Sequence, residues 1–151
     1  MKRLLIDTNV LLDFLLGRNP FGQPAKEILL LAEKDKTLEF TSASAVTDIY
    51  YLLEKAIRQS VEDKSEASYL MAQSKIKDLI SLVSILPVTS TDILHAIELG
   101  WKDFEDAVLY SVALANDIDF IISRDKGFIG SDIPVISPEE FLAGKQTKEE
   151  S

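Results

Sequence analysis

The chain has 151 residues, of which 46% are hydrophobic, and a formal net charge of −9. These values are typical of one globular domain, and the apolar runs are far too short to span a bilayer. Because the chain has no cysteine and one histidine, disulfides, thiolate nucleophiles and sulfur-ligated or multi-histidine metal sites are excluded, and any bound metal must have oxygen ligands.

Five short apolar runs have the length of buried parallel strands, and turn residues separate them from the segments between. In chain order they cover residues 4–6, 38–40, 85–88, 120–122 and 135–136. Residues 25–32, behind Pro24, have helical spacing, and residues 69–83 repeat this spacing over several turns. The alternation predicts an α/β fold, a three-layer α/β/α sandwich with a mostly parallel sheet.

The predicted domain covers residues 1–143, and the polar segment 144–151 lacks periodicity, which is typical of a frayed tail. The start, MKRLLIDTNV, lacks the apolar region and cleavage site of a signal peptide, so a cytoplasmic protein that does not bind membranes is expected. The acidic balance argues against a broad basic surface. Binding of nucleic acid would therefore need a local basic patch or bound cations.

Two predicted strands end in acids, which places both at one edge of the sheet. The first strand ends on Asp7, and the strand at 120–122 leads through Ser123 to Asp125. In open parallel sheets, ligands bind at this carboxyl edge. Asp125 also suits a simple turn, whereas Asp7 is harder to explain as structural because Asn9 could cap the following helix.

A third acidic position opens the helix that begins near residue 103. Asp103 and Asp106 are three residues apart and lie on one helix face, although Asp103 is also a natural N-cap with Asp106 in a capping-box-like pattern. The small residues Ala107, Ser111 and Ala115 form a stripe that predicts close packing of this helix on the sheet. Such packing would bring its first turn near the strand ends.

Asp48 is the fourth candidate, in the segment SASAVTDIYYLLEKA. It lies opposite the hydrophobic stripe at residues 46–57, so by itself it suits a solvated helix surface. Carboxylates gathered at one edge repel each other unless a cation is present, and Mg²⁺ or Mn²⁺ prefers such oxygen ligands. Two such ions can activate water and stabilise the leaving oxygen in phosphodiester cleavage.

Four segments together resemble the PIN-domain ribonucleases and, within them, the VapC-type toxins of toxin–antitoxin pairs. They are LLIDTNVLLDFLL, TSASAVTDIYYLLEKA, DFEDAVLYSVALANDIDFIISRDKGF and SDIPVISPEEFL. The resemblance covers nearly the whole chain, and the order and spacing of the segments are more specific than any one of them. It implies a PIN-like parallel sheet of about five strands with helices on both faces, in agreement with the hydrophobic pattern.

The resemblance also implies a site and a reaction. The catalytic acids, which would also bind the metal, correspond by position to Asp7, Asp48, Asp106 and Asp125. Asp48 stands where the family usually has glutamate. The accessory residues are Asn9, Asp103 and Ser123. The implied activity is Mg²⁺- or Mn²⁺-dependent hydrolysis of RNA by a metal-activated water, with an antitoxin and a second copy of the chain as partners.

Two other functions remain open from the sequence. A degenerate PIN domain could keep the fold as a binding module. A haloacid-dehalogenase-like phosphatase would use Asp7 as nucleophile, but its general acid would fall on Asn9, whose amide cannot protonate a leaving group. A receiver domain would need a phosphoacceptor at the third strand, and the segment LPVTS has none.

Surface features bear on the partners. Tyr51 and Leu52 fall off the core stripe of their predicted helix and are candidate anchors for a homodimer or for an antitoxin segment. We assign no role to His95, expected at or near the surface, or to Trp101, expected to pack at a helix–helix turn. The candidates for phosphate contacts near the site are Lys2, Arg3, Arg18, Lys102, Arg124 and Lys126.

Overall fold

The sheet has five parallel strands in the order β3-β2-β1-β4-β5. The computed structural model describes residues 1–60, 67–125, 128 and 130–150, of which 145–150 are described by their backbone only. The strands are β1 (Lys2–Ile6), β2 (Thr37–Ser42), β3 (Ser84–Leu86), β4 (Phe120–Ile122) and β5 (Val135–Ile136). Each predicted strand is confirmed, and its ends differ from the predicted ends by at most two residues.

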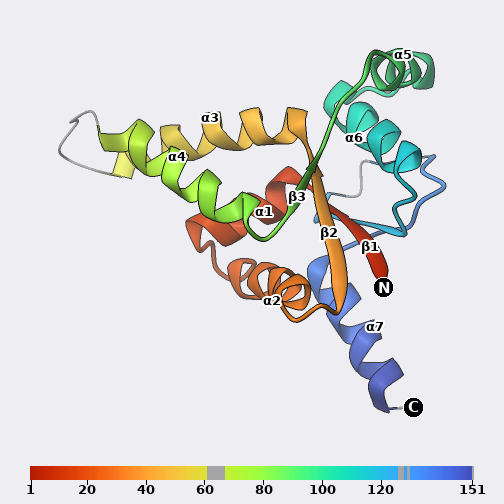
Figure 1. Cartoon of the computed structure of the whole chain (residues 1–151), viewed down its shortest axis with the longest axis horizontal. Coiled ribbons are helices and arrows are strands. Elements are labelled where there is room, and N and C mark those ends of the chain that lie inside the picture. The colour runs from red at the N-terminus through yellow and green to blue at the C-terminus, as the bar shows by residue number, and fades with distance from the viewer. Residues whose placement is uncertain (61–66, 126–127, 129, 151) are drawn as a thin grey trace.

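Helices cover both faces of this sheet, which confirms the three-layer α/β/α sandwich (Figure 1). They are α1 (Thr8–Leu16), α2 (Gly22–Glu33), α3 (Ala43–Ser60), α4 (Ala67–Ile80), α5 (Ser90–Leu99), α6 (Phe104–Ala115) and α7 (Pro138–Glu150). One face packs against α1 to α4 and α7, and the other against α6, with α5 on its outer side. In the described part of the chain, no helix is both long and apolar enough to cross a membrane.

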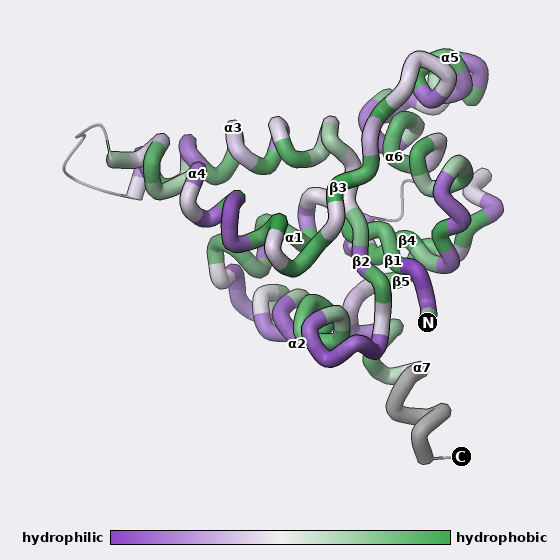
Figure 2. The backbone as a smooth tube through the Cα atoms, viewed as in Figure 1, coloured by the Kyte–Doolittle hydropathy of each residue, from purple (hydrophilic) through white to green (hydrophobic). Residues whose placement is uncertain are grey.

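The central strand β1 is apolar from Leu4 to Ile6, where both of its faces are buried. Leu4 and Ile6 belong to the core under α1 and α2, whereas Leu5 packs with Leu109 of α6 on the opposite face. This alternation follows from the two-residue period of a strand. The helices are amphipathic by contrast, and hydrophobic and hydrophilic segments alternate along α3 (Figure 2).

The stripe of small residues on α6 does not face the sheet, so this part of the prediction is wrong. Ala107 packs with Ala96 of α5, and the Ser111 hydroxyl lies 2.8 Å from Nδ1 of the half-buried His95 of the same helix. Ala115 is exposed. Small side chains allow close approach of any neighbour, and here that neighbour is α5.

Trp101 packs at the α5–α6 turn, as the sequence predicts, with its ring stacked on Tyr110 at 4.9 Å between centroids. At the other end of the chain, α7 continues as helix to Glu150. The domain boundary at residues 143 and 144 stays a prediction.

Strand order reverses beside β1. The chain builds β2 and β3 on one side of β1 and then returns to place β4 and β5 on the other. Asp7 follows β1 directly, and its backbone N–H donates to the carbonyl of Ile122 at the end of β4 over 2.9 Å. Ligands of open parallel sheets bind at such a reversal point, at the carboxyl ends of the strands.

Candidate functional site

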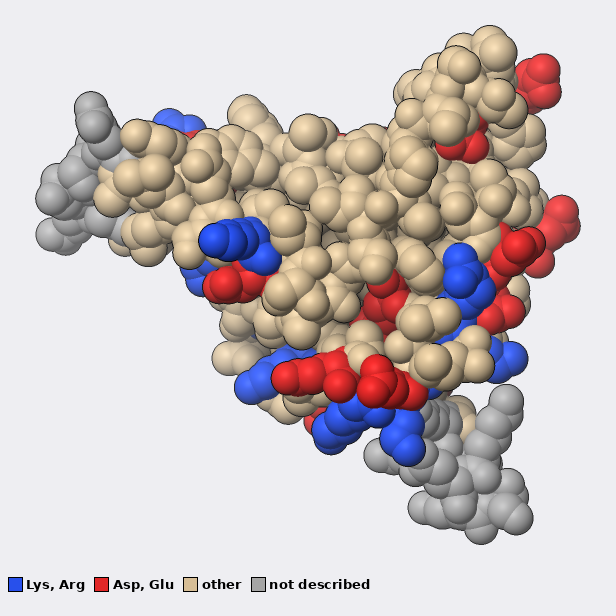
Figure 3. Space-filling view, in the orientation of Figure 1, with Lys and Arg blue, Asp and Glu red and all other residues tan. Residues whose placement is uncertain are grey.

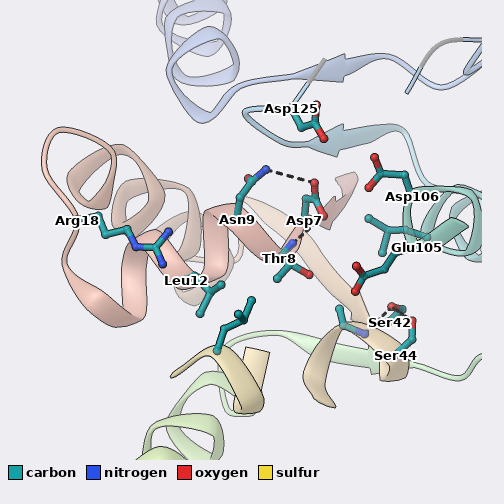
Figure 4. A pocket seen from close by; sticks show the side chains of 13 residues that line it. Asp7, Thr8, Asn9, Leu12, Arg18, Ser42, Ser44, Glu105, Asp106 and Asp125 are labelled. Carbon is teal, nitrogen blue, oxygen red and sulfur yellow. Dashed lines mark hydrogen bonds between the residues drawn. The ribbon is translucent and has the colours of Figure 1, made fainter. Parts of the chain in front are cut away.

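A cavity of about 270 Å³ opens at this reversal point. Figure 4 shows carboxylates of three elements directed toward it, from the end of β1, the first turn of α6 and the segment after β4. The residues that line it are Asp7, Thr8, Asn9, Leu12, Arg18, Ser42, Ser44, Ala45, Leu52, Glu105, Asp106, Leu109 and Asp125. The structure therefore brings together three of the four predicted catalytic acids.

Asp7 is buried and is only 6% exposed. One carboxylate oxygen accepts the backbone N–H of Thr8 over 2.7 Å, and the other accepts the Ser123 hydroxyl over 2.7 Å. Burial raises the pKa of Asp7, while these two hydrogen bonds lower it in part. The charges of Asp125 and Asp103 add to the rise.

Asp7, rather than Asn9, is the N-cap of α1, which corrects the expectation from the sequence. The Asn9 side chain instead spans the ends of β1 and β4. Its amide lies 3.5 Å from Asp7 and 3.3 Å from the Ser123 hydroxyl, and its carbonyl oxygen accepts the Arg124 N–H over 3.3 Å. Ser123 Oγ also accepts the Asp125 N–H over 2.9 Å. Ser123 thus links the two segments that carry Asp7 and Asp125.

The first turn of α6 supplies Asp106. Asp103 is the N-cap and accepts the Asp106 N–H over 3.0 Å, as predicted. Asp106 is 8% exposed, and its buried Oδ2 accepts no hydrogen bond from the described residues. Burial, together with the charges of Asp7, Asp103 and Asp125, raises the pKa of Asp106 to about 7. An unsatisfied buried oxygen of this kind costs free energy, so it marks a position that suits a cation or a proton.

Asp48 does not line the cavity. It is half-buried on α3, four residues from both Ser44 and Leu52, which do line it. Residues four apart share a helix face, so Asp48 lies on the face of α3 that borders the cavity. Its assignment to the site stays a proposal.

Sequence reasoning missed Glu105, Ser42 and Ser44. Glu105 adds a further carboxylate from the first turn of α6, and its side chain lies between the aspartates and the two serines (Figure 4). The Ser42 and Ser44 hydroxyls are 2.9 Å apart, and Ser42 accepts the N–H of Ala45 at the start of α3. The available signals were the acidic run DFED and the cap residues in TSAS after a predicted strand.

The donor set fits a hard divalent cation. All of its ligand candidates are carboxylate oxygens, and Asp106 Oδ2 is buried without a hydrogen-bond donor among the described residues. Magnesium and manganese prefer such ligands. Across the described ranges, however, no three acidic or histidine side chains are grouped with the spacing of a metal site. The chemistry of the lining side chains nevertheless suits a cation.

The chain is similar to known proteins over most of its length. The PIN domain family matches residues 3–127. Ribonuclease VapC1 of Aquifex aeolicus is 29% identical over 145 residues, which cover 93% of each chain. VapC20 of Mycobacterium tuberculosis, described as a sarcin-ricin loop cleaving toxin, superposes with a TM-score of 0.63 at 16% identity, over 86% of this chain and 95% of its own. A toxin–antitoxin complex from Klebsiella pneumoniae gives 0.62 at 19% identity, over 89% and 97%.

Proposed function

This chain belongs to the PIN domain family, and on that premise we propose that it is a metal-dependent endoribonuclease and the toxin of a toxin–antitoxin pair, acting in the cytoplasm. The observation that carries the proposal is the cavity at the reversal point, where Asp7, Asp106 and Asp125 converge. The similarity to Ribonuclease VapC1 over 93% of the chain supports it. Family membership sets aside the haloacid-dehalogenase alternative.

Asp7, Asp106 and Asp125 would hold Mg²⁺ or Mn²⁺, and Asp48 would complete the set from α3. The metal, when bound, supplies positive charge beside the scissile phosphate and lowers the pKa of water. Asn9 and Ser123 keep the carboxylate of Asp7 in place through the hydrogen bonds described above. Such supporting contacts determine how well a metal site binds its ion.

The protein itself need not supply a nucleophile. No cysteine exists in the chain, and the one histidine, His95, contacts Ser111 on the far side of α6 rather than a hydroxyl of the cavity. The serine and threonine hydroxyls of the cavity therefore have no neighbouring imidazole as a base. Attack by water rather than by the ribose 2′-hydroxyl would leave 5′-phosphate and 3′-hydroxyl ends.

The experiment is to incubate the purified protein with total RNA and Mg²⁺ or Mn²⁺ and to map the cut ends. We expect Asp125→Asn to reduce cleavage by orders of magnitude with the fold intact, whereas Asp103→Asn, which keeps the helix cap, should reduce it less. Cleavage in excess EDTA, or ends with 2′,3′-cyclic phosphate, would contradict the mechanism. RNA binding without cleavage would favour the binding-module alternative.

A partner surface follows from the exposed apolar residues of α3. Tyr51 is 63% exposed and Leu52 is 41% exposed, which agrees with the sequence pattern. Figure 3 shows that the face over α3 has few charged side chains, while charges gather on the lower part of the view. We propose that this surface binds an antitoxin segment or a second copy of the chain.

Leu52 connects this surface to the site because it also lines the cavity. A partner bound over Leu52 would therefore lie at the cavity mouth. Coexpression with a candidate antitoxin tests the proposal: Tyr51→Ala and Leu52→Ala should weaken copurification or dissociate the dimer, as measured by light scattering. A monomeric wild type whose partner is retained equally by both variants would contradict it.

A further inference from the structure

One basic side chain lines the acidic cavity. Of the lysines and arginines in the described part of the chain, Arg18 alone lines it, beside four carboxylates. Lys126, another candidate from the sequence, lies outside the described residues. A cation at this position repels a bound metal ion, so metal binding does not explain its presence.

The end of α1 fixes the backbone of Arg18. The helix stops at Gly17, which adopts the left-handed conformation at φ 61° that favours glycine. The N–H of Arg18 then donates to the carbonyl oxygen of Asp13 over 3.0 Å. This turn directs the Arg18 side chain along α1 toward the cavity (Figure 4).

The guanidinium of Arg18 is only weakly engaged. It forms one ion pair with a described residue, from Nη1 to Asp13 Oδ1 at 3.7 Å, and 44% of its side chain is exposed. Among the described residues, its guanidinium makes no hydrogen bond. Most of its five N–H donors are therefore available to a ligand.

A second arginine already satisfies Asp13. Arg124 donates to both carboxylate oxygens, from Nε over 2.6 Å and from Nη2 over 3.1 Å, and its guanidinium lies 4.0 Å from the centre of the Phe21 ring. Asp13, whose side chain is 2% exposed, thus has its charge neutralised without Arg18. Stabilising Asp13 does not explain why Arg18 is present.

We propose that Arg18 contacts a backbone phosphate of the RNA strand, next to the phosphate that is cleaved. This inference rests on the proposed function. A strand that enters the cavity of a protein with a net charge of −9 meets repulsion beyond the reach of the metal, and a guanidinium with free donors can bind a phosphate by two parallel hydrogen bonds. Arg18 lies at the rim, on the side of the cavity away from Asp106 (Figure 4).

The test is binding of a fluorescently labelled oligouridylate, measured by anisotropy over a series of salt concentrations with Mn²⁺ present. The parent protein carries Asp125→Asn to prevent cleavage. Arg18→Gln is added to it, and Arg58→Gln is the matched control, because Arg58 pairs with Glu54 on the exposed side of α3 at 3.2 Å and is absent from the cavity. Arg18→Lys retains the charge and loses the paired donors.

We expect Arg18→Gln to weaken binding about tenfold and to reduce the slope of log affinity against log salt by about 0.7, the value for one single-strand phosphate contact. Arg18→Lys should keep the slope and recover part of the affinity. Equal affinity and slope for Arg18→Gln and Arg58→Gln, or no binding by the parent at low salt, would overturn the inference. If the wild type does not cleave RNA but Arg18→Gln still weakens binding, RNA hydrolysis is refuted and the phosphate contact of Arg18 is supported.

Discussion

Replacement of Asp106 by asparagine should stabilise the protein when no divalent ion is present. The pKa of this carboxyl rises from 3.8 to about 7 in the folded protein, first because of burial and then because of the charges of Asp7, Asp103 and Asp125. The folded state therefore binds the proton more tightly than the unfolded chain does. This contribution to stability is full below pH 3.8 and is lost as pH rises toward 7.

The magnitude follows from the same values. The rise from 3.8 to about 7 corresponds to about 4 kcal/mol at about 1.4 kcal/mol per pH unit. Water in the open cavity screens the charge, so we expect Asp106→Asn to raise the free energy of unfolding by about 1–2 kcal/mol above pH 7. For a chain of this size, that gives a Tm increase of about 2–8 °C. The amide can also donate toward the neighbouring carboxylates, which the carboxylate oxygen cannot do.

The assay is thermal unfolding by circular dichroism in EDTA, at pH 8 and at pH 5. Asp78→Asn on the exposed side of α4 is the matched control, because it removes one negative charge far from the cavity. The increase in Tm caused by Asp106→Asn, relative to wild type, should be larger at pH 8 than at pH 5. Addition of Mg²⁺ or Mn²⁺ should raise the Tm of the wild type and raise that of Asp106→Asn much less. A Tm of Asp106→Asn in EDTA at pH 8 that is no higher than that of Asp78→Asn would contradict charge repulsion at Asp106.

Substitutions at three further positions separate the roles of neighbouring residues. Ser123→Ala removes the 2.7 Å hydrogen bond to Asp7, so calorimetry should show about 10–100-fold weaker Mn²⁺ binding, and unchanged affinity would contradict its supporting role. Asp13→Asn leaves Arg124 without its buried charge partner and should lower the free energy of unfolding in urea by about 1–3 kcal/mol; a neutral result would mean that water replaces the pair. Asp103→Ala should cost about 1 kcal/mol through the lost cap, whereas Asp103→Asn should cost only a few tenths, and equal losses would exclude capping as the reason.

Local sequence patterns were sufficient to predict the strands and the acidic residues that follow two of them. A buried parallel strand must be apolar on both faces, so the first polar residue after such a run marks the strand end, as at Asp7. In the same way, Ser123 marks the end of the strand at 120–122, and Asp125 follows two residues later. Capping chemistry identified Asp103 for an equally local reason, since an N-cap is defined by its own side chain and the next turn.

The remaining parts of the site depend on tertiary structure. Glu105 and Ser42 meet at the cavity only because α6 and the end of β2 converge on one edge of the sheet, and no local pattern links residues so far apart. The small residues Ala107 and Ser111 were predicted to pack on the sheet but pack on α5. Small side chains allow close packing, but they do not indicate which element is the neighbour. Arg18 could be named as one of six basic candidates, but only the turn at Gly17 shows that its side chain reaches the cavity.

The position of β1 at the centre of the sheet also determines when the site can form. β1 pairs with β4, and the hydrogen bond from Ser123 to Asp7 spans 116 residues, so the contact forms late and slowly for topological reasons. During synthesis, the chain up to α6 contains Asp7 and Asp106 but neither β4 nor Asp125. A nascent chain on the ribosome, surrounded by RNA, therefore has no assembled acidic centre until residue 125 has emerged and β4 has docked beside β1.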